Sequence, residues 1–240
     1  MWPVCKKELQ QFFSGLTGYL AIGVFLVVNG LVLFVFNDNL FEYGYATLDP
    51  FFALAPWILL FLIPAITMRS FSEEFRTGTY EILQAQPIST FQILLGKYLA
   101  ALLVVIIAFV PTGLYAVTIN QLAADKGLDF GATLGAYIGL LLLAGVFASI
   151  SLFCSSLTSN AVVAFLLSAI GCATIHYGAQ AISQLPLFSG TLDYYIDMAG
   201  IEFHYRSIRR GLIDIRDLIY FGSLVATFLL LTQRNLLHKR

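Results

Sequence analysis

Long apolar segments alternate with short polar ones along the 240-residue chain. A helix needs roughly 20 apolar residues to cross the hydrocarbon core of a bilayer, and six segments come close to this length or exceed it. Their apolar residues are continuous and do not alternate with period two, so they predict helices and not the strands of a membrane barrel. The six predicted spans cover residues 16–36, 51–68, 98–119, 134–157, 161–182 and 218–233.

The polar segment before the first span predicts an amphipathic helix. Leu9, Phe12 and Phe13 recur at the spacing of one helical face, while Lys6 and Lys7 lie largely off that face. Such a helix lies in the plane of the lipid headgroups, with its lysines toward anionic lipid. An ordinary basic flank of the first span is the alternative interpretation.

The segment between the second and third spans, residues 69–97, carries the densest local signals. Ser70 and Glu73 match a capping box, which predicts that a helix starts at the membrane surface. Phe71 and Phe75 then share one face of this helix at a spacing of four residues. A segment that only connects two spans could be much shorter, so this length favours a docking role over a plain solvated loop.

The same segment also contains a stop and a restart signal. Gly78 offers a left-handed residue that ends the first short helix, and Glu81 lies in a predicted second one. Pro87 then breaks the chain, and Ser89 with Gln92 forms a second capping-box match that opens the helix of the third span. The pattern predicts a compact, charged pair of helices between two spans.

Two further features lie toward the other end of the predicted bundle. Residues 183–217 mix apolar residues such as Phe203 and Ile208 with arginines, which predicts an interfacial or partly re-entrant helix. A plain amphipathic connector explains this segment at least as well as a contact with a transported substrate. His176 lies alone deep in the fifth span, where a hydrogen-bonded packing role is favoured over a proton relay.

Lysine and arginine residues in the flanks predict the orientation of the chain. The amino-terminal tail, residues 69–97 and the carboxyl-terminal tail lie on one side if the number of spans is even. That side carries eight basic residues, and the opposite side carries five. We therefore expect both termini in the cytoplasm. The eight are Lys6, Lys7, Arg69, Arg76, Lys97, Arg234, Lys239 and Arg240, and the five are Lys126, Arg206, Arg209, Arg210 and Arg216.

Composition excludes most other classes of protein. Hydrophobic residues make up 59% of the chain and charged residues only 11%, against about 25% charged in soluble domains. A net charge of −1 argues against a nucleic-acid partner.

The chain has no Walker A motif, no metal-ligand motif and no paired nucleophile and base, so we expect no catalysis and no cofactor of its own. The first span exceeds a signal-peptide core, so we expect it to be retained. The sequence predicts a single all-α transmembrane domain over residues 1–240.

The order and spacing of several short motifs resemble the permease subunits of ABC-2 type ABC transporters. The motifs are KKEL at 6–9, RSFSEEFRTGTYEIL at 69–83, PIS at 87–89, SSLTSN at 155–160 and RGLIDIRDLIY at 210–220. Within this family, residues 48–71 (LDPFFALAPWILLFLIPAITMRSF) most resemble the gliding-motility-associated permease of Bacteroidetes-type bacteria. The resemblance covers essentially the whole chain.

This resemblance implies a location and a set of partners. The chain would lie in the bacterial inner membrane as a multi-pass protein, paired with a second copy of itself. Two copies of an ABC ATP-binding subunit would bind ATP and Mg²⁺ in the cytoplasm and dock on a coupling helix of the permease between spans two and three. A membrane-anchored accessory subunit would face the periplasm. The resemblance assigns docking of the ATPase subunit to Phe71, Glu73, Glu74, Phe75, Arg76, Gly78 and Glu81.

Two other functions fit the same residues. One is a membrane scaffold that transports nothing and links a cytoplasmic ATPase to gliding or secretion machinery. The other is a free-standing channel or carrier, which would have no ATPase partner.

Overall fold

The computed structural model describes residues 1–36, 47–123, 127–185 and 192–238, and every regular element within these ranges is a helix. Lys126, Lys239 and Arg240, which were counted for the orientation, lie outside the described residues. The helices are α1 Trp2–Ser14, α2 Leu16–Phe34, α4 Asp49–Thr67, α5 Arg69–Thr77, α6 Thr79–Gln84, α7 Thr90–Phe109, η1 Val110–Thr112, α8 Gly113–Leu122, α9 Phe130–Leu157, α10 Ala161–Ser183, α11 Leu192–Met198, α12 Ile201–Arg209 and α13 Ile215–His238.

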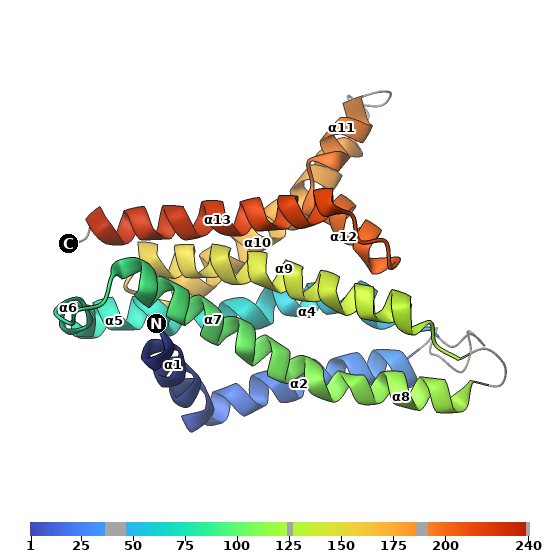
Figure 1. Cartoon of the computed structure of the whole chain (residues 1–240), viewed down its shortest axis with the longest axis horizontal. Coiled ribbons are helices and arrows are strands. Elements are labelled where there is room, and N and C mark those ends of the chain that lie inside the picture. Colours follow the sequence, from blue (N-terminus) through green and yellow to red (C-terminus); the bar gives the residue numbers. More distant parts are fainter. Residues whose placement is uncertain (37–46, 124–126, 186–191, 239–240) are drawn as a thin grey trace.

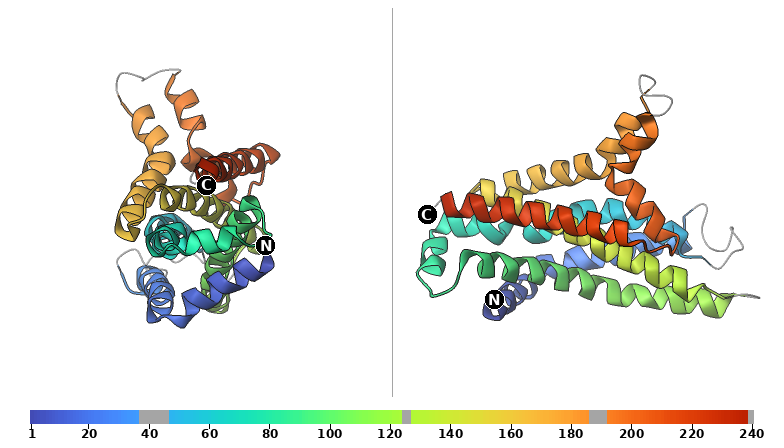
Figure 2. Two further views of the ribbon diagram at one scale, coloured as in Figure 1. Left: turned by 90° about the vertical axis from the view of Figure 1, so that its left-hand side faces the viewer. Right: turned by 45° about the horizontal axis from the view of Figure 1, so that its top comes forward.

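The long helices form an elongated bundle, and the short helices lie at its two ends (Figure 1). The helix α1 runs crosswise to the bundle axis near the end that carries α5 and α6, and both chain ends lie at that same end. At the other end the outer part of α10 and the helix α11 project away from the bundle (Figure 2). The chain thus has one end with a surface helix and a bent connection, and an opposite end with a projecting hairpin.

Five helical segments of the described chain are long and apolar enough to cross a membrane. They are Asp49–Thr77, Thr90–Leu122, Phe130–Leu157, Ala161–Ser183 and Ile215–His238. The pair α1 and α2, bent by 74° at the corner between them, raises the number to six if it counts as one span. The prediction of an all-α polytopic membrane protein is confirmed.

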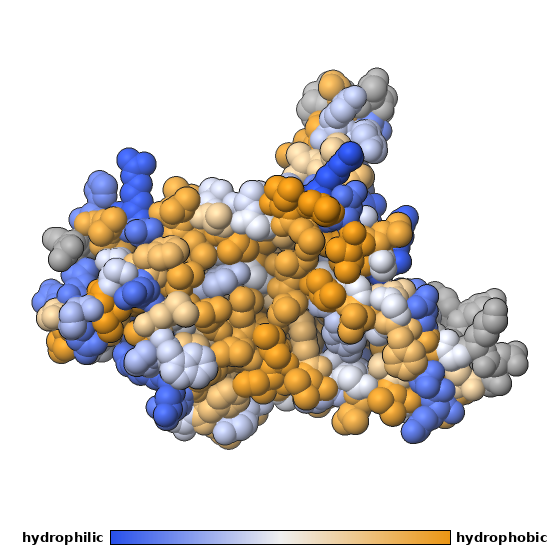
Figure 3. All heavy atoms as spheres, viewed as in Figure 1, coloured by the Kyte–Doolittle hydropathy of each residue, from blue (hydrophilic) through white to orange (hydrophobic). Residues whose placement is uncertain are grey.

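The surface of the bundle shows the polarity that a membrane requires. On the face shown in Figure 3, apolar side chains cover the middle of the bundle, and hydrophilic side chains gather toward its two ends. Since apolar surface in the middle of the bundle faces lipid instead of water, its exposure carries no cost.

The helix α9 forms the centre of the bundle. It packs against α4, α7, α10, α12 and α13, and 78% of its most apolar stretch is buried. Small residues on α9 make this contact close: a Cβ atom on Gly139 would lie 2.8 Å from Ile208 on α12, and one on Gly135 would lie 3.1 Å from Gly211. The small-residue face of the fourth span therefore packs within the chain.

The segment after α10 folds back onto the bundle. Ile201, Tyr205 and Ile208 of α12 are buried, and the Tyr205 hydroxyl donates a hydrogen bond of 2.8 Å to the carbonyl of Phe52 on α4. Burial raises the pKa of the Tyr205 hydroxyl above its ordinary value. Gly211, with φ +82°, then turns the chain into α13. Within this segment α12 is packed on the bundle, whereas α11 buries no residue and projects from it.

Candidate functional site

The best-defined polar structure of the chain is the elbow, which we define as α5 and α6 (residues 69–84) at the end of the bundle (Figure 2). Its first helix follows α4 with only Met68 between them, and the two together count as one helix of 29 residues. The elbow is therefore an extension of the second span that leaves the apolar band.

The predicted capping box at the start of this helix is wrong. The helix begins at Arg69, one residue before Ser70, and its N-cap residue Met68 makes no side-chain cap. The hydroxyl of Ser155, at the end of α9, accepts hydrogen bonds from the backbone N–H groups of Phe71 (3.1 Å) and Ser72 (3.2 Å). It also donates one of 3.0 Å to the carbonyl of Met68. A distant helix thus supplies the cap that the local pattern assigned to Ser70.

The other local signals of the elbow are confirmed. Gly78 ends α5 in a left-handed conformation with φ +70°. A Cβ atom built there would have no neighbour within 4 Å, so glycine is required by the backbone conformation and not by a lack of space. Glu81 lies in the short helix α6. Ser89 and Gln92 form a complete capping box at the start of α7, with bonds of 3.2 and 3.4 Å.

Three aromatic rings join the two helices of the elbow. The ring centroids of Phe75 and Tyr80 are 5.0 Å apart, and each lies 6.3 Å from the ring of Phe71. Phe71 and Tyr80 belong to a second apolar core, separate from the main one, to which α7, α9 and α13 also contribute. The elbow therefore packs against three spans, in addition to its covalent connections at the two ends.

A buried lysine fixes the elbow to two further helices. The side chain of Lys97, on α7, is fully buried, and its Nζ donates to Glu8 Oε1 on α1 (2.7 Å) and to Glu74 Oε1 on α5 (2.9 Å). It also donates to the carbonyl of Ser70 (2.7 Å) and lies 5.0 Å from the centroid of the Phe71 ring. All three donors of the ammonium group are satisfied, as the burial of a charge requires.

In the sequence, Lys97 stands out only as one of eight basic residues on its side of the membrane. The only sequence feature that indicates burial of Lys97 is its position, since it lies between the capped start of α7 and the apolar residues of the same helix. Its partners come from α1 and α5, which no local pattern connects with α7. The network of Lys97, Glu8 and Glu74 is thus a feature that only the fold reveals.

The structure divides the predicted docking residues by exposure. Arg76, Gly78 and Glu81 are exposed, and Glu73 and Phe75 are partly buried. Phe71 and Glu74 lie in the interior of the chain, where their neighbours are its own helices. Ile82 is 67% exposed on α6 and was not among the residues that the sequence singled out. The outward surface of the elbow includes Arg76, Thr77, Gly78, Thr79, Glu81 and Ile82, with Glu73 at its edge.

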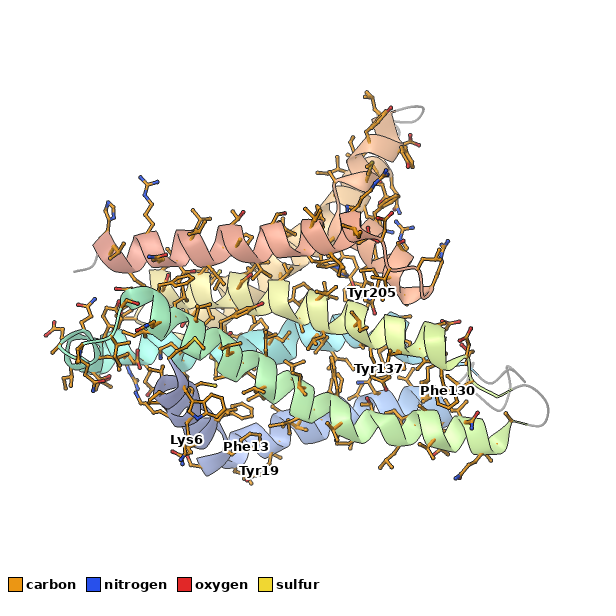
Figure 4. All side chains as sticks on the ribbon, in the orientation of Figure 1. Lys6, Phe13, Tyr19, Phe130, Tyr137 and Tyr205 are labelled. Carbon is orange, nitrogen blue, oxygen red and sulfur yellow. The ribbon has the colours of Figure 1, made fainter. Side chains whose placement is uncertain are left out.

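The predicted surface helix α1 contacts both the bundle and the elbow. Lys6 and Lys7 are exposed, while Leu9, Phe12 and Phe13 are partly buried. Figure 4 shows Lys6 on the outer side of α1 and Phe13 at the corner with α2.

The opposite side of this helix packs on α7. Val4 and Cys5 are buried there, and a Cβ atom on Gly96 of α7 would lie 2.9 Å from Val4. Burial raises the pKa of the Cys5 thiol, and the nearby Glu8 carboxylate adds to this shift. The Nζ of Lys7 lies 3.4 Å from Glu74 Oε1, which links α1 directly to the elbow.

A second group of ionisable residues lies at the opposite end of the bundle. The Nε2 atom of His176, which is fully buried, is 3.1 Å from Glu202 Oε2 on α12. His204 bonds to Asp217 (2.6 Å), and Arg206 bonds to Asp197 (2.8 Å). The sequence did not show that His176 has a carboxylate partner, because α12 reaches it only by folding back.

Neither group resembles a metal site or a catalytic site. No set of three or more His, Cys, Asp or Glu side chains is placed to hold a metal ion in the part of the chain that the structure describes. The cysteines Cys5, Cys154 and Cys172 are free and buried. What the elbow geometry offers is an exposed, charged helical surface mechanically joined to the membrane spans.

Residues 29–194 match the profile of a family described as ABC-2 family transporter protein. This match includes the spans from α4 to α10 and the whole elbow. No curated protein matches the chain closely enough to count as a relative.

Proposed function

Since this chain belongs to the ABC-2 family of transporter proteins, it is a permease subunit of an ABC transporter, and we propose that its elbow docks a separate ATP-binding subunit. Two copies of that subunit bind ATP and Mg²⁺, and hydrolysis there drives work across the membrane. The chain itself carries no catalysis and holds no cofactor.

The observation that carries this proposal is the way the elbow is attached. It continues the helix of α4, its first turn is bonded to Ser155 on α9, and Lys97 ties it to α7 and α1. A displacement of the elbow by a docked subunit reaches α1, α4, α7 and α9 directly, because they are bonded to it or continuous with it.

The proposed docking surface differs in part from the seven residues to which the resemblance assigns docking. Arg76, Glu81 and Ile82 face outward and contact the ATP-binding subunit, with Glu73 and Phe75 at the edge of the contact. Phe71 and Glu74 shape the elbow from the inside. An exposed isoleucine among charged residues is the arrangement expected of an interface with an apolar centre and a polar rim.

The membrane arrangement follows from the same proposal. The elbow end of the bundle, with both chain ends, faces the cytoplasm of a bacterial cell, and the projecting α11 faces the periplasm. The excess of basic residues on the elbow side supports this orientation. Two copies of the chain form the working permease.

The narrower assignment to a gliding-motility-associated system rests on the resemblance of residues 48–71. In such a system the accessory subunit meets the periplasmic end, where α11 exposes Tyr194 and Tyr195. The scaffold alternative shares the fold and the ATPase partner and differs only in lacking a transported molecule.

The experiment is a pull-down of the tagged chain from its native membrane in mild detergent, with mass spectrometry of the proteins recovered. We expect a P-loop ATPase in near-stoichiometric amount. Ile82→Asp should lower its recovery tenfold or more, because burial of an isoleucine contributes about 1.5–3 kcal/mol and about 1.4 kcal/mol is a factor of ten.

The matched control is Leu212→Asp. Leu212 is 66% exposed, as Ile82 is 67% exposed, but it lies at the opposite end of the bundle. Its variant should recover the ATPase as the unmodified chain does. Equal recovery with both variants contradicts the docking proposal, and recovery of the chain alone in every case favours a free-standing channel or carrier.

A further inference from the structure

A cavity of 480 Å³ lies between the surface helix α1 and the elbow. Its walls come from α1, from the start of α2, from the last turn of α4 and from α5, with one residue of α6. Its lining includes Glu73, at the edge of the proposed docking contact, but not Arg76, Glu81 or Ile82, which form that contact. What the cavity binds can therefore be tested separately from whether an ATP-binding subunit docks on the elbow.

The lining of this cavity changes from apolar to charged along its length. Phe12, Ala65 and Ile66 line it from α1 and the end of the second span, and Arg69, Glu73 and Glu74 line it from the elbow. A phospholipid at the membrane surface has the same sequence of polarity, from acyl chain to charged headgroup. The crosswise amphipathic α1 places the cavity at the level of the headgroups.

The charges in the cavity offer partners for both an anion and a cation. Lys7 and Arg69 have side chains 53% and 58% exposed, and their ion pairs within the chain are long, at 3.4 and 3.8 Å. Contacts of this length leave their N–H donors available for a phosphate group, which binds at 2.7–2.9 Å in charge-assisted hydrogen bonds.

Glu74 supplies the complementary acceptor. Its side chain is nine-tenths buried, and Oε1 already accepts from Lys97. Its other oxygen, Oε2, is buried and has no hydrogen-bond partner among the residues that the structure describes. A buried carboxylate oxygen of this kind is costly unless an N–H or O–H donor reaches it.

We propose that this cavity binds the headgroup of an aminophospholipid, with its phosphate on Lys7 and Arg69 and its primary ammonium on Glu74. The acyl chains then lie over Phe12 and Ile66. A choline headgroup has no N–H to donate to Glu74. A glycerol headgroup can donate an O–H but carries no positive charge to pair with this carboxylate. The site therefore distinguishes phosphatidylethanolamine from phosphatidylcholine and phosphatidylglycerol of equal chain length.

The test is native mass spectrometry of the delipidated full-length chain titrated with these three lipids. We expect one phosphatidylethanolamine to bind at least tenfold more tightly than either competitor. Soluble phosphoethanolamine shares the headgroup chemistry and should bind at least a hundredfold more weakly, because it lacks the acyl chains. Equal affinity for the three lipids overturns the proposal, and phosphoethanolamine binding as tightly as the lipid overturns the assignment to a membrane source.

Two alanines on α4 provide matched variants. Ala65→Phe fills the cavity and should abolish the selective binding, while Ala53→Phe, at an exposed position of the same helix, should leave it unchanged. The double variant Lys7→Gln with Arg69→Gln changes only side chains that are more than half exposed, so it keeps the proposal testable if Ala65→Phe does not fold. It should weaken phosphatidylethanolamine binding at least tenfold, and unchanged selective binding in this double variant also overturns the proposal.

Discussion

Replacing Lys97 with methionine tests whether the buried ammonium group holds α1, α5 and α7 together. The change keeps an unbranched side chain, shorter by one atom, and removes its charge and its three hydrogen bonds. Glu8 and Glu74, 15% and 10% exposed, are then left as uncompensated carboxylates. Removing one partner of a buried ion pair costs about 3–5 kcal/mol. Because Lys7 is close enough to contact Glu74 instead, we expect about 3 kcal/mol.

The assay is thermal unfolding of the purified chain in detergent. A loss of about 3 kcal/mol corresponds to a fall in Tm of roughly 6–12 °C, at about 2–4 °C per kcal/mol for a chain of this size. The same variant should loosen the attachment of α1 to α7, because the ion pair between Glu8 and Lys97 is lost, and limited proteolysis near the amino terminus detects this change.

A triple variant separates the loss of charge pairing from a loss of packing. Lys97→Met combined with Glu8→Gln and Glu74→Gln leaves no unpaired charge in the network. Because it removes the uncompensated buried carboxylates that destabilise the single variant, this triple variant should recover at least half of the lost Tm. A single variant as stable as the unmodified chain, or a triple variant as unstable as the single one, refutes the reasoning.

Three further outcomes can be measured. Gly139→Val forces a side chain against α12 and should lower the free energy of unfolding by about 1–3 kcal/mol, measured by thermal unfolding. Gly23→Val, with open space around it, should leave the stability unchanged. Equal Tm values for the two variants contradict the close packing at Gly139. Cys5 should react slowly with a maleimide at neutral pH, because it is buried and its pKa is raised, and faster as the pH rises; rapid labelling at neutral pH contradicts its burial. His176→Leu removes from α10 the partner of Glu202, which lies on α12, and should speed proteolysis between α12 and α13. Unchanged cleavage argues that this pair does not hold α12 on the bundle.

The features that the sequence predicted correctly depend on residues close together in the chain. The left-handed stop at Gly78 and the capping box of Ser89 and Gln92 involve neighbours at most three residues apart, and their geometry needs nothing from the rest of the fold. The apolar spans are equally local, because the length of a helix in lipid is set by the thickness of the bilayer.

The features that the sequence did not predict depend on residues far apart. The start of the elbow helix is capped by Ser155 instead of Ser70. Ser155 lies 84 positions along the chain from Phe71, whose N–H group donates a hydrogen bond to it. The partners of Lys97 and His176 come from other helices, and their pairing follows only from the packing of those helices. For the same reason the sequence could not separate the predicted docking residues that face outward from those that face the interior.

The bond between Glu8 and Lys97 joins residues 89 positions apart, and this separation sets an order of events during synthesis. At about 5–20 residues per second, the ribosome needs roughly 4–18 s to add the residues between them. Throughout that interval the first helix has no ammonium group to receive its glutamate. The ion pair between the amino-terminal helix and the third span can therefore form only after Lys97 has been synthesised, whereas Lys7 of the same helix can pair with Glu74 earlier.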